Sequence, residues 1–162
     1  MMLSKDSKQE INKWLEKFPK DKRRSAVIMA LRIAQDEHGH LSEELMQEVA
    51  DYVEIPKAYV YEVATFYTMY RLEPHGKYTI AICDSISCML CGSKQLLAYT
   101  EKKLGIKVGE TTPDGIFTLK NAECLAACCA APAVLVNDNI YHDNMTPDKM
   151  DNLIDFLKNG DS

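Results

Sequence analysis

The chain has 162 residues, of which 46% are hydrophobic and 27% are charged, and its net charge is −5. This composition supports a packed core and excludes global disorder, and the acidic balance argues against a nucleic-acid binder, which shows a basic face. No apolar run approaches the roughly 20 residues that span a bilayer, and the polar start of the chain shows no signal-peptide pattern. We therefore expect a cytoplasmic protein with no direct membrane insertion.

Residues 1–75 are expected to form an N-terminal helical bundle. Apolar residues recur there at helical spacing in four stretches. Gly39 suits the end of the second helix, Ser42 the N-cap of the third, and Pro56 the start of the fourth. The fourth helix carries an aromatic side that we interpret mainly as core: Tyr59, Phe66, Tyr67 and Tyr70.

Residues 76–162 show a different pattern, which predicts a small mixed sheet flanked by helices. The chain after this break reads as a β-α-β-β-β-α series. The expected strands are 77–83, 117–120, 133–137 and 140–142, and the expected helices are 89–104 and a last one starting at 146. Asp138 and Asn139 are expected to form the turn of the final hairpin. The fold class is therefore α+β.

All six cysteines lie between positions 83 and 129. Four of them form two pairs, Cys83-x4-Cys88 and Cys124-x3-Cys128. We expect each pair to bracket a loop at a strand end, so the loops would meet at one end of the sheet if the strands are neighbours. In a reducing compartment, clustered thiols more often bind metal or perform redox chemistry than form disulfides.

The spacing favours an iron–sulfur cluster but leaves its ligands open. A [2Fe–2S] cluster takes four thiolates, and both loops contain the small or polar residues that let a backbone approach cluster sulfurs. Plant-type spacing gives a second ligand set, in which Cys91 replaces Cys128. Structural zinc is another alternative. A redox dithiol at Cys88 and Cys91 is a third.

Five stretches in order give the chain a resemblance to a known family, the thioredoxin-like [2Fe–2S] subunit of respiratory NADH dehydrogenase (complex I), which is the E-type subunit of bacterial NADH-quinone oxidoreductase. These stretches are 26–42, 60–70, 83–93, 104–138 and 141–146. The resemblance implies a thioredoxin-like [2Fe–2S] ferredoxin domain at 76–162. It also implies a cluster bound by Cys83, Cys88, Cys124 and Cys128, with Cys91 not a ligand.

The resemblance also implies electron transfer within a larger complex, peripheral to the inner membrane. NADH would reduce FMN on a partner subunit, and the cluster here would exchange single electrons with that flavin. Other peripheral-arm subunits would be further partners. The chain has no glycine-rich nucleotide motif, so it carries no complete active site of its own. The alternatives are the equivalent diaphorase subunit of an NAD-linked hydrogenase or formate dehydrogenase, and a non-redox zinc-thiolate protein.

The sequence departs from the usual family pattern at three positions. Family members often have a basic residue where Cys91 stands and glycine where Ala126 stands, and Cys129 is uncommon. Alanine tolerates a positive φ poorly, which argues against a left-handed backbone at 126. We interpret Cys91 and Cys129 as small buried thiols. Pro132 stands where thioredoxin-like folds often carry a cis proline.

Overall fold

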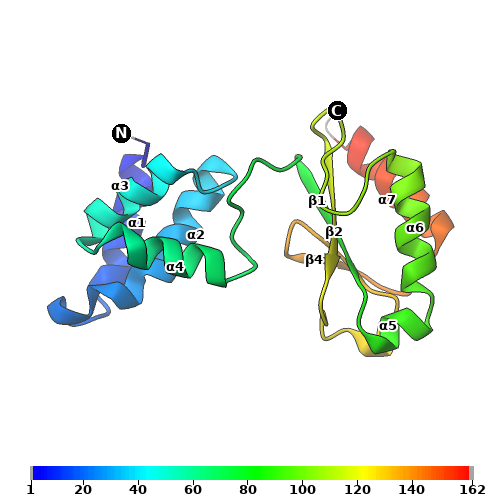
Figure 1. The fold of residues 1–162 in the computed structure, drawn as a ribbon, viewed down its shortest axis with the longest axis horizontal. Coiled ribbons are helices and arrows are strands. Elements are labelled where there is room, and N and C mark those ends of the chain that lie inside the picture. Colours follow the sequence, from blue (N-terminus) through cyan, green and yellow to red (C-terminus); the bar gives the residue numbers. More distant parts are fainter. Residues whose placement is uncertain (1, 161–162) are drawn as a thin grey trace. The chain divides into compact units, whose positions relative to one another are not determined.

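The computed structural model describes residues 2–160, which form two compact units that divide between Pro74 and His75. Figure 1 shows the helices of the first unit and the sheet and helices of the second. Each unit buries its own cluster of apolar side chains. Within residues 2–160, no helix is long and apolar enough to cross a membrane.

The first unit is a bundle of short helices around an apolar core. Its elements are α1 (Lys5–Leu15), a 3-10 helix (Lys20–Ala26), α2 (Val27–His38), α3 (Glu43–Val53) and α4 (Lys57–Phe66). The predicted boundary signals are confirmed: Gly39 ends α2 with a φ of 81°, the Ser42 hydroxyl accepts a hydrogen bond from the Leu45 N–H, and Pro56 precedes α4.

The aromatic side of α4 and the segment after it is not mainly core, so that interpretation is wrong. Only Tyr70 is buried, and its hydroxyl donates to the Ile28 carbonyl at 2.7 Å. Phe66 is 77% exposed, and Tyr59 and Tyr67 are also exposed. Tyr59 and Phe66 lie within α4, but the buried residues of this helix are Val60 and Ala64, so the two aromatic side chains lie outside the face that packs against the core.

The second unit confirms the α+β class. Its elements are β1 (Tyr78–Cys83), α5 (Ile86–Leu90), α6 (Ser93–Leu104), β2 (Phe117–Ala122), a 3-10 helix (Cys128–Ala130), β3 (Val134–Val136), β4 (Ile140–His142) and α7 (Pro147–Asn159). The strand order is β2-β1-β3-β4, in which only β1 and β2 are parallel. Helices α6 and α7 lie together against one face of the sheet, as Figure 1 shows.

Two local predictions for this unit need correction. The single helix expected at 89–104 is two helices, because Gly92 adopts a φ of 97° and breaks the chain between α5 and α6. The hairpin loop is 137–139, so it contains the predicted turn residues Asp138 and Asn139 but begins one residue earlier than predicted. Asn137 and Asp138 both have positive φ values, of 50° and 62°.

The register of the strands brings the cysteine-bearing segments to one end of the sheet. Cys83, the last residue of β1, lies opposite Ala122, the last residue of the parallel strand β2. Strand β3 runs antiparallel to β1, so the segment that enters β3 reaches the same end. The backbone N–H of Cys83 donates to the Ala133 carbonyl there, at 3.1 Å.

Candidate metal centre

Cys83 and Cys88 form a buried pair held by regular secondary structure. Cys83 ends β1 and Cys88 lies within α5, and each is 2% exposed. The pair packs against Ala133, which is fully buried. The sequence predicts Cys88 at the end of a loop, but α5 begins earlier than predicted and includes it. A strand and a helix therefore fix the positions of both sulfurs.

Backbone amides point at the two buried sulfurs. Burial acts to raise the pKa of the Cys83 thiol, but hydrogen bonds from the N–H groups of Leu125 and Ser85, together with the Cys88 thiol, bring that pKa below its usual value. Burial raises the pKa of the Cys88 thiol, and the nearby sulfurs of Cys83 and Cys128 raise it further. A hydrogen bond from the Ala133 N–H to the Cys88 sulfur acts in the opposite direction. Such N–H groups are the donors that a buried thiolate needs.

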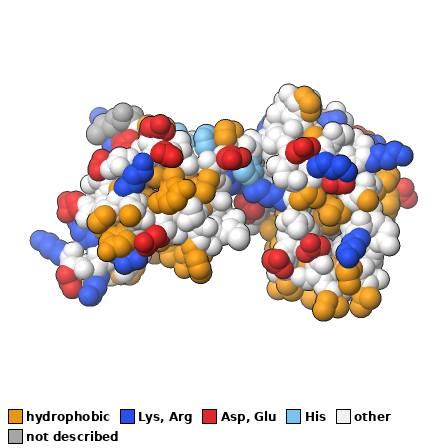
Figure 2. Space-filling model, viewed as in Figure 1, with side chains coloured by type: hydrophobic (Ala, Val, Ile, Leu, Met, Phe, Trp, Pro, Cys, Tyr) orange, Lys and Arg blue, Asp and Glu red, His pale blue; other side chains and the backbone are white. Residues whose placement is uncertain are grey.

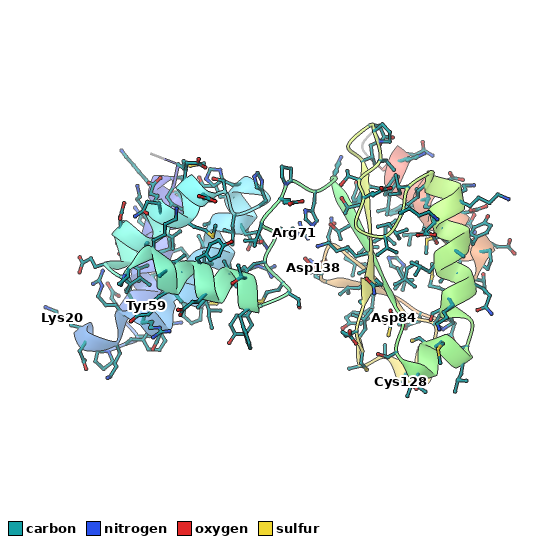
Figure 3. All side chains as sticks on the ribbon, in the orientation of Figure 1. Lys20, Tyr59, Arg71, Asp84, Cys128 and Asp138 are labelled. Carbon is teal, nitrogen blue, oxygen red and sulfur yellow. The ribbon has the colours of Figure 1, made fainter. Side chains whose placement is uncertain are left out.

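Cys124 and Cys128 are both exposed; Cys124 lies on an irregular loop, and Cys128 is the first residue of the 3-10 helix that follows this loop. They line a pocket of about 460 Å³ between the two cysteine-bearing segments, and Figure 3 shows Asp84 and Cys128 at this end of the sheet. The other lining residues are Ser85, Ile86, Ser87, Met89 and Glu123.

The loop between Cys124 and Cys128 has a left-handed residue at its centre. Ala126 adopts a φ of 57°, contrary to our expectation from the alanine side chain. Its N–H donates to the Cys124 sulfur at 3.4 Å. The left-handed conformation costs alanine roughly 1–2 kcal/mol, so the surrounding contacts must hold this loop in place.

Cys91 and Cys129 are exposed, so the prediction that both are buried is wrong. Cys91 follows α5 at the break before α6, and Cys129 lies in the same short 3-10 helix as Cys128. Neither is among the residues that line the pocket between the two loops.

The donor set fits a two-metal cluster better than a single ion. A structural zinc site needs four donors around one point. A [2Fe–2S] cluster instead divides its thiolates between two irons. One buried pair, one exposed pair, a pocket between their loops and amides on the sulfurs match that division.

Sequence reasoning misses two groups that shape this site. One is the Ala133 backbone, which bonds to both residues of the buried pair. The other is the Tyr141 hydroxyl on β4, which donates to the Leu125 carbonyl at 3.1 Å. A backbone amide leaves no signal in a sequence. Tyr141 lies in one of the stretches that carry the family resemblance, and its place there is the sole signal for it.

The fold and the clustered thiols together are those of a small protein of the thioredoxin-like ferredoxin class. The Ala131–Pro132 peptide is cis, in agreement with the thioredoxin-like placement of Pro132. Residues 11–158 match the family model of the thioredoxin-like [2Fe-2S] ferredoxins. The chain belongs to this family, and its cofactor is a [2Fe–2S] cluster.

Curated relatives match the chain over most of its length. Two of them are E-type subunits of NADH-quinone oxidoreductases. The one from Rhizobium meliloti, designated E 2, is 47% identical over 151 residues, which cover 93% of this chain and 88% of the relative. The one from Rickettsia conorii is 44% identical over 146 residues, which cover 90% of this chain and 87% of the relative. Both units of the chain fall within these matches.

A solved structure shares the fold over both units. The NAD+-reducing [NiFe]-hydrogenase in its air-oxidized state contains a chain that matches 82% of this one with a TM-score of 0.71 and 20% sequence identity. The match covers 23% of that longer hydrogenase chain. At this identity the likeness concerns the fold alone.

Proposed function

We propose that the chain is the electron-transfer subunit of an NADH:quinone oxidoreductase, with its [2Fe–2S] cluster bound by Cys83, Cys88, Cys124 and Cys128. The observation that carries this proposal is the meeting of the two cysteine pairs at one end of the sheet, with backbone amides directed at three of their sulfurs. The relatives named above are subunits of such an oxidoreductase.

The residues of the chain would hold and tune the cluster, and do no bond chemistry on a substrate. The cluster, when held by these residues, would supply one-electron redox chemistry. The amides of Leu125 and Ser85 stabilise negative charge on the Cys83 sulfur, and the Ala133 amide does so for Cys88. Hydrogen bonds to the sulfurs and burial are the main means by which a protein sets the potential of such a cluster.

The electron donor in this proposal is a flavin on a partner subunit, which also binds NADH. An apolar surface beside the site supports docking of a partner there. Ile86 is 73% exposed and Leu90 is 79% exposed, four residues apart on α5. Figure 2 shows apolar side chains gathered at the end of this unit that carries α5. A cytoplasmic location, peripheral to the membrane, follows from the same proposal.

The ligand set is tested by electron paramagnetic resonance on anaerobically prepared, dithionite-reduced protein, with iron and acid-labile sulfide assays. The variants are Cys128→Ser, Cys91→Ser and Cys129→Ser. We expect a rhombic signal in the wild type that survives both Cys91→Ser and Cys129→Ser and is lost or altered in Cys128→Ser. A signal that survives Cys128→Ser but is lost in Cys91→Ser would replace this ligand set with the plant-type one.

The partner is tested by co-purification with the flavin-binding subunit. Leu90→Glu places a charge on the apolar surface of α5 and is expected to weaken the complex. Phe156→Glu is the matched control, because Phe156 is 70% exposed on α7. Equal retention of the flavin subunit by both variants would place the docking surface elsewhere.

A diaphorase subunit of an NAD-linked hydrogenase is the second candidate, and the fold shared with the hydrogenase chain is the observation that favours it. Co-purification distinguishes the two candidates. Quinone-reducing partners would support the first, and a hydrogenase partner would support the second.

A further inference from the structure

Tyr141 reaches from the edge of the sheet to the exposed cysteine loop. Its residue lies on β4, and its hydroxyl donates a hydrogen bond of 3.1 Å to the Leu125 carbonyl, between Cys124 and Cys128. The ring is 52% exposed, so the side chain does not serve as buried core. The hydroxyl makes the contact that links β4 to the loop of the exposed pair.

The Leu125 carbonyl, which accepts the hydrogen bond from Tyr141, is part of the peptide group whose N–H contacts the Cys124 sulfur. The Leu125–Ala126 peptide accepts from Tyr141 at its oxygen, and its N–H donates to the Cys124 sulfur at 3.4 Å. The preceding amide, the N–H of Leu125, donates to the Cys83 sulfur on the other segment. Leu125 therefore connects Tyr141 to both cysteine pairs.

This peptide orientation is unfavourable for the residue that follows it. Ala126 is left-handed, with a φ of 57°, and alanine adopts that conformation only when other contacts impose it. A hydrogen bond to a peptide oxygen also polarises the peptide and strengthens its N–H as a donor. The Tyr141 hydroxyl thus acts on both the direction and the strength of the N–H bond to Cys124.

We propose that Tyr141 is a positioning residue for the redox centre: its hydroxyl fixes the Leu125–Ala126 peptide so that the Ala126 N–H stays on the Cys124 sulfur. This inference rests on the proposed function, because it takes Cys124 as a cluster ligand. Hydrogen bonds to cluster sulfurs stabilise the reduced, more negative state and raise its potential. Removal of the hydroxyl therefore makes the cluster harder to reduce.

The test compares Tyr141→Phe with Tyr99→Phe in the full-length, cluster-loaded protein by a reductive titration followed with electron paramagnetic resonance. Tyr99 is the matched control, since its hydroxyl donates to Asp151 at 2.9 Å, on α7. In Tyr141→Phe, we expect the equilibrium constant for reduction of the cluster to fall by up to about tenfold, which lowers the reduction potential by about 59 mV for one electron. We also expect its g-values to change. Tyr99→Phe is expected to match the wild type.

A second variant separates positioning from a general loss of stability. Glycine adopts a left-handed backbone without strain, so Ala126→Gly makes the peptide orientation less dependent on the hydroxyl. We expect Tyr141→Phe to shift the potential less in the Ala126→Gly protein than in the wild type. If Tyr141→Phe alone loses its cluster, Ala126→Gly is expected to restore it, and a loss that persists in the double variant would overturn the inference.

The outcomes distinguish this inference from the proposed function. A wild-type protein without iron and sulfide would overturn the function itself. A wild-type cluster with equal potentials in Tyr141→Phe and Tyr99→Phe would overturn only the role of Tyr141. A shift in potential caused by Tyr141→Phe that is equally large in the Ala126→Gly protein would also overturn only the role of Tyr141.

Discussion

The two cysteine pairs are held in position by different parts of the structure. Cys83 and Cys88 lie in a strand and a helix and are buried, whereas Cys124 and Cys128 are exposed and bound a loop that contains a left-handed residue. The buried pair is fixed by core packing and by the ladder of β1. The exposed loop is held by single hydrogen bonds, such as the one from Tyr141.

In the proposed ligand set, this difference would give the two halves of the site separate tasks. A buried pair shields one side of a cluster from water, and a low-dielectric setting strengthens the amide bonds to its sulfurs. An exposed pair would leave the other side close to the protein surface, where a partner can approach it. The difference between the buried and the exposed pair leads to three predictions, given from the largest expected effect to the smallest.

The largest expected effect concerns thiol reactivity with iodoacetamide. In the cluster-loaded protein, Cys91 and Cys129 should react, because they are exposed and are not proposed as ligands. After chelation of the iron, Cys124 and Cys128 should become reactive as well. Cys83 and Cys88 should react at least about a hundredfold more slowly, since a local opening that costs about 3 kcal/mol must come first.

Mass spectrometry of peptides from timed samples measures these rates site by site. Unfolded protein in urea is the control, where all six thiols should react alike. Rates within a factor of a few at all six sites in the folded, cluster-free protein would show that the buried pair is not protected by the fold.

A larger side chain beneath the buried pair is expected to have the next largest effect. Ala133 is fully buried against Cys83 and Cys88, so Ala133→Leu should destabilise the protein by about 1–3 kcal/mol through overpacking. Urea unfolding measures this change. The control is Ala98→Leu on the exposed side of α6, which is expected to stay within about 0.5 kcal/mol of the wild type. Equal effects at both positions would contradict the assigned packing.

The smallest expected effect is a stabilisation on the exposed loop. Ala126→Gly removes the left-handed strain and should raise the free energy of unfolding by about 1 kcal/mol, less the entropy that glycine adds to the unfolded chain. Ala127→Gly is the control, because Ala127 has a φ of −113° and gains no such relief. A stabilisation by Ala127→Gly, or a loss by Ala126→Gly, would mean that Ala126 is not strained.

Local sequence patterns predict most of the fold. Gly39, Ser42 and Pro56 mark helix boundaries by chemistry that acts within a few residues, and all three predictions are confirmed. The four strands lie within about two residues of their predicted bounds, because alternation and β-branched residues are local signals. The prediction for the aromatic residues Tyr59, Phe66 and Tyr67 is wrong, since burial depends on what packs opposite them and not on their spacing.

The sequence alone determined the α+β class, the order of the elements and the identity of the thiols, because periodicity, capping and residue chemistry are properties of short segments. Only the tertiary structure decided which thiols are buried, how the Leu125–Ala126 peptide is oriented, and that Tyr141 reaches it. Each of these features depends on contacts between segments far apart in the chain. The register of β1 with β2 and β3 creates those contacts, and spacing along a sequence does not contain that register.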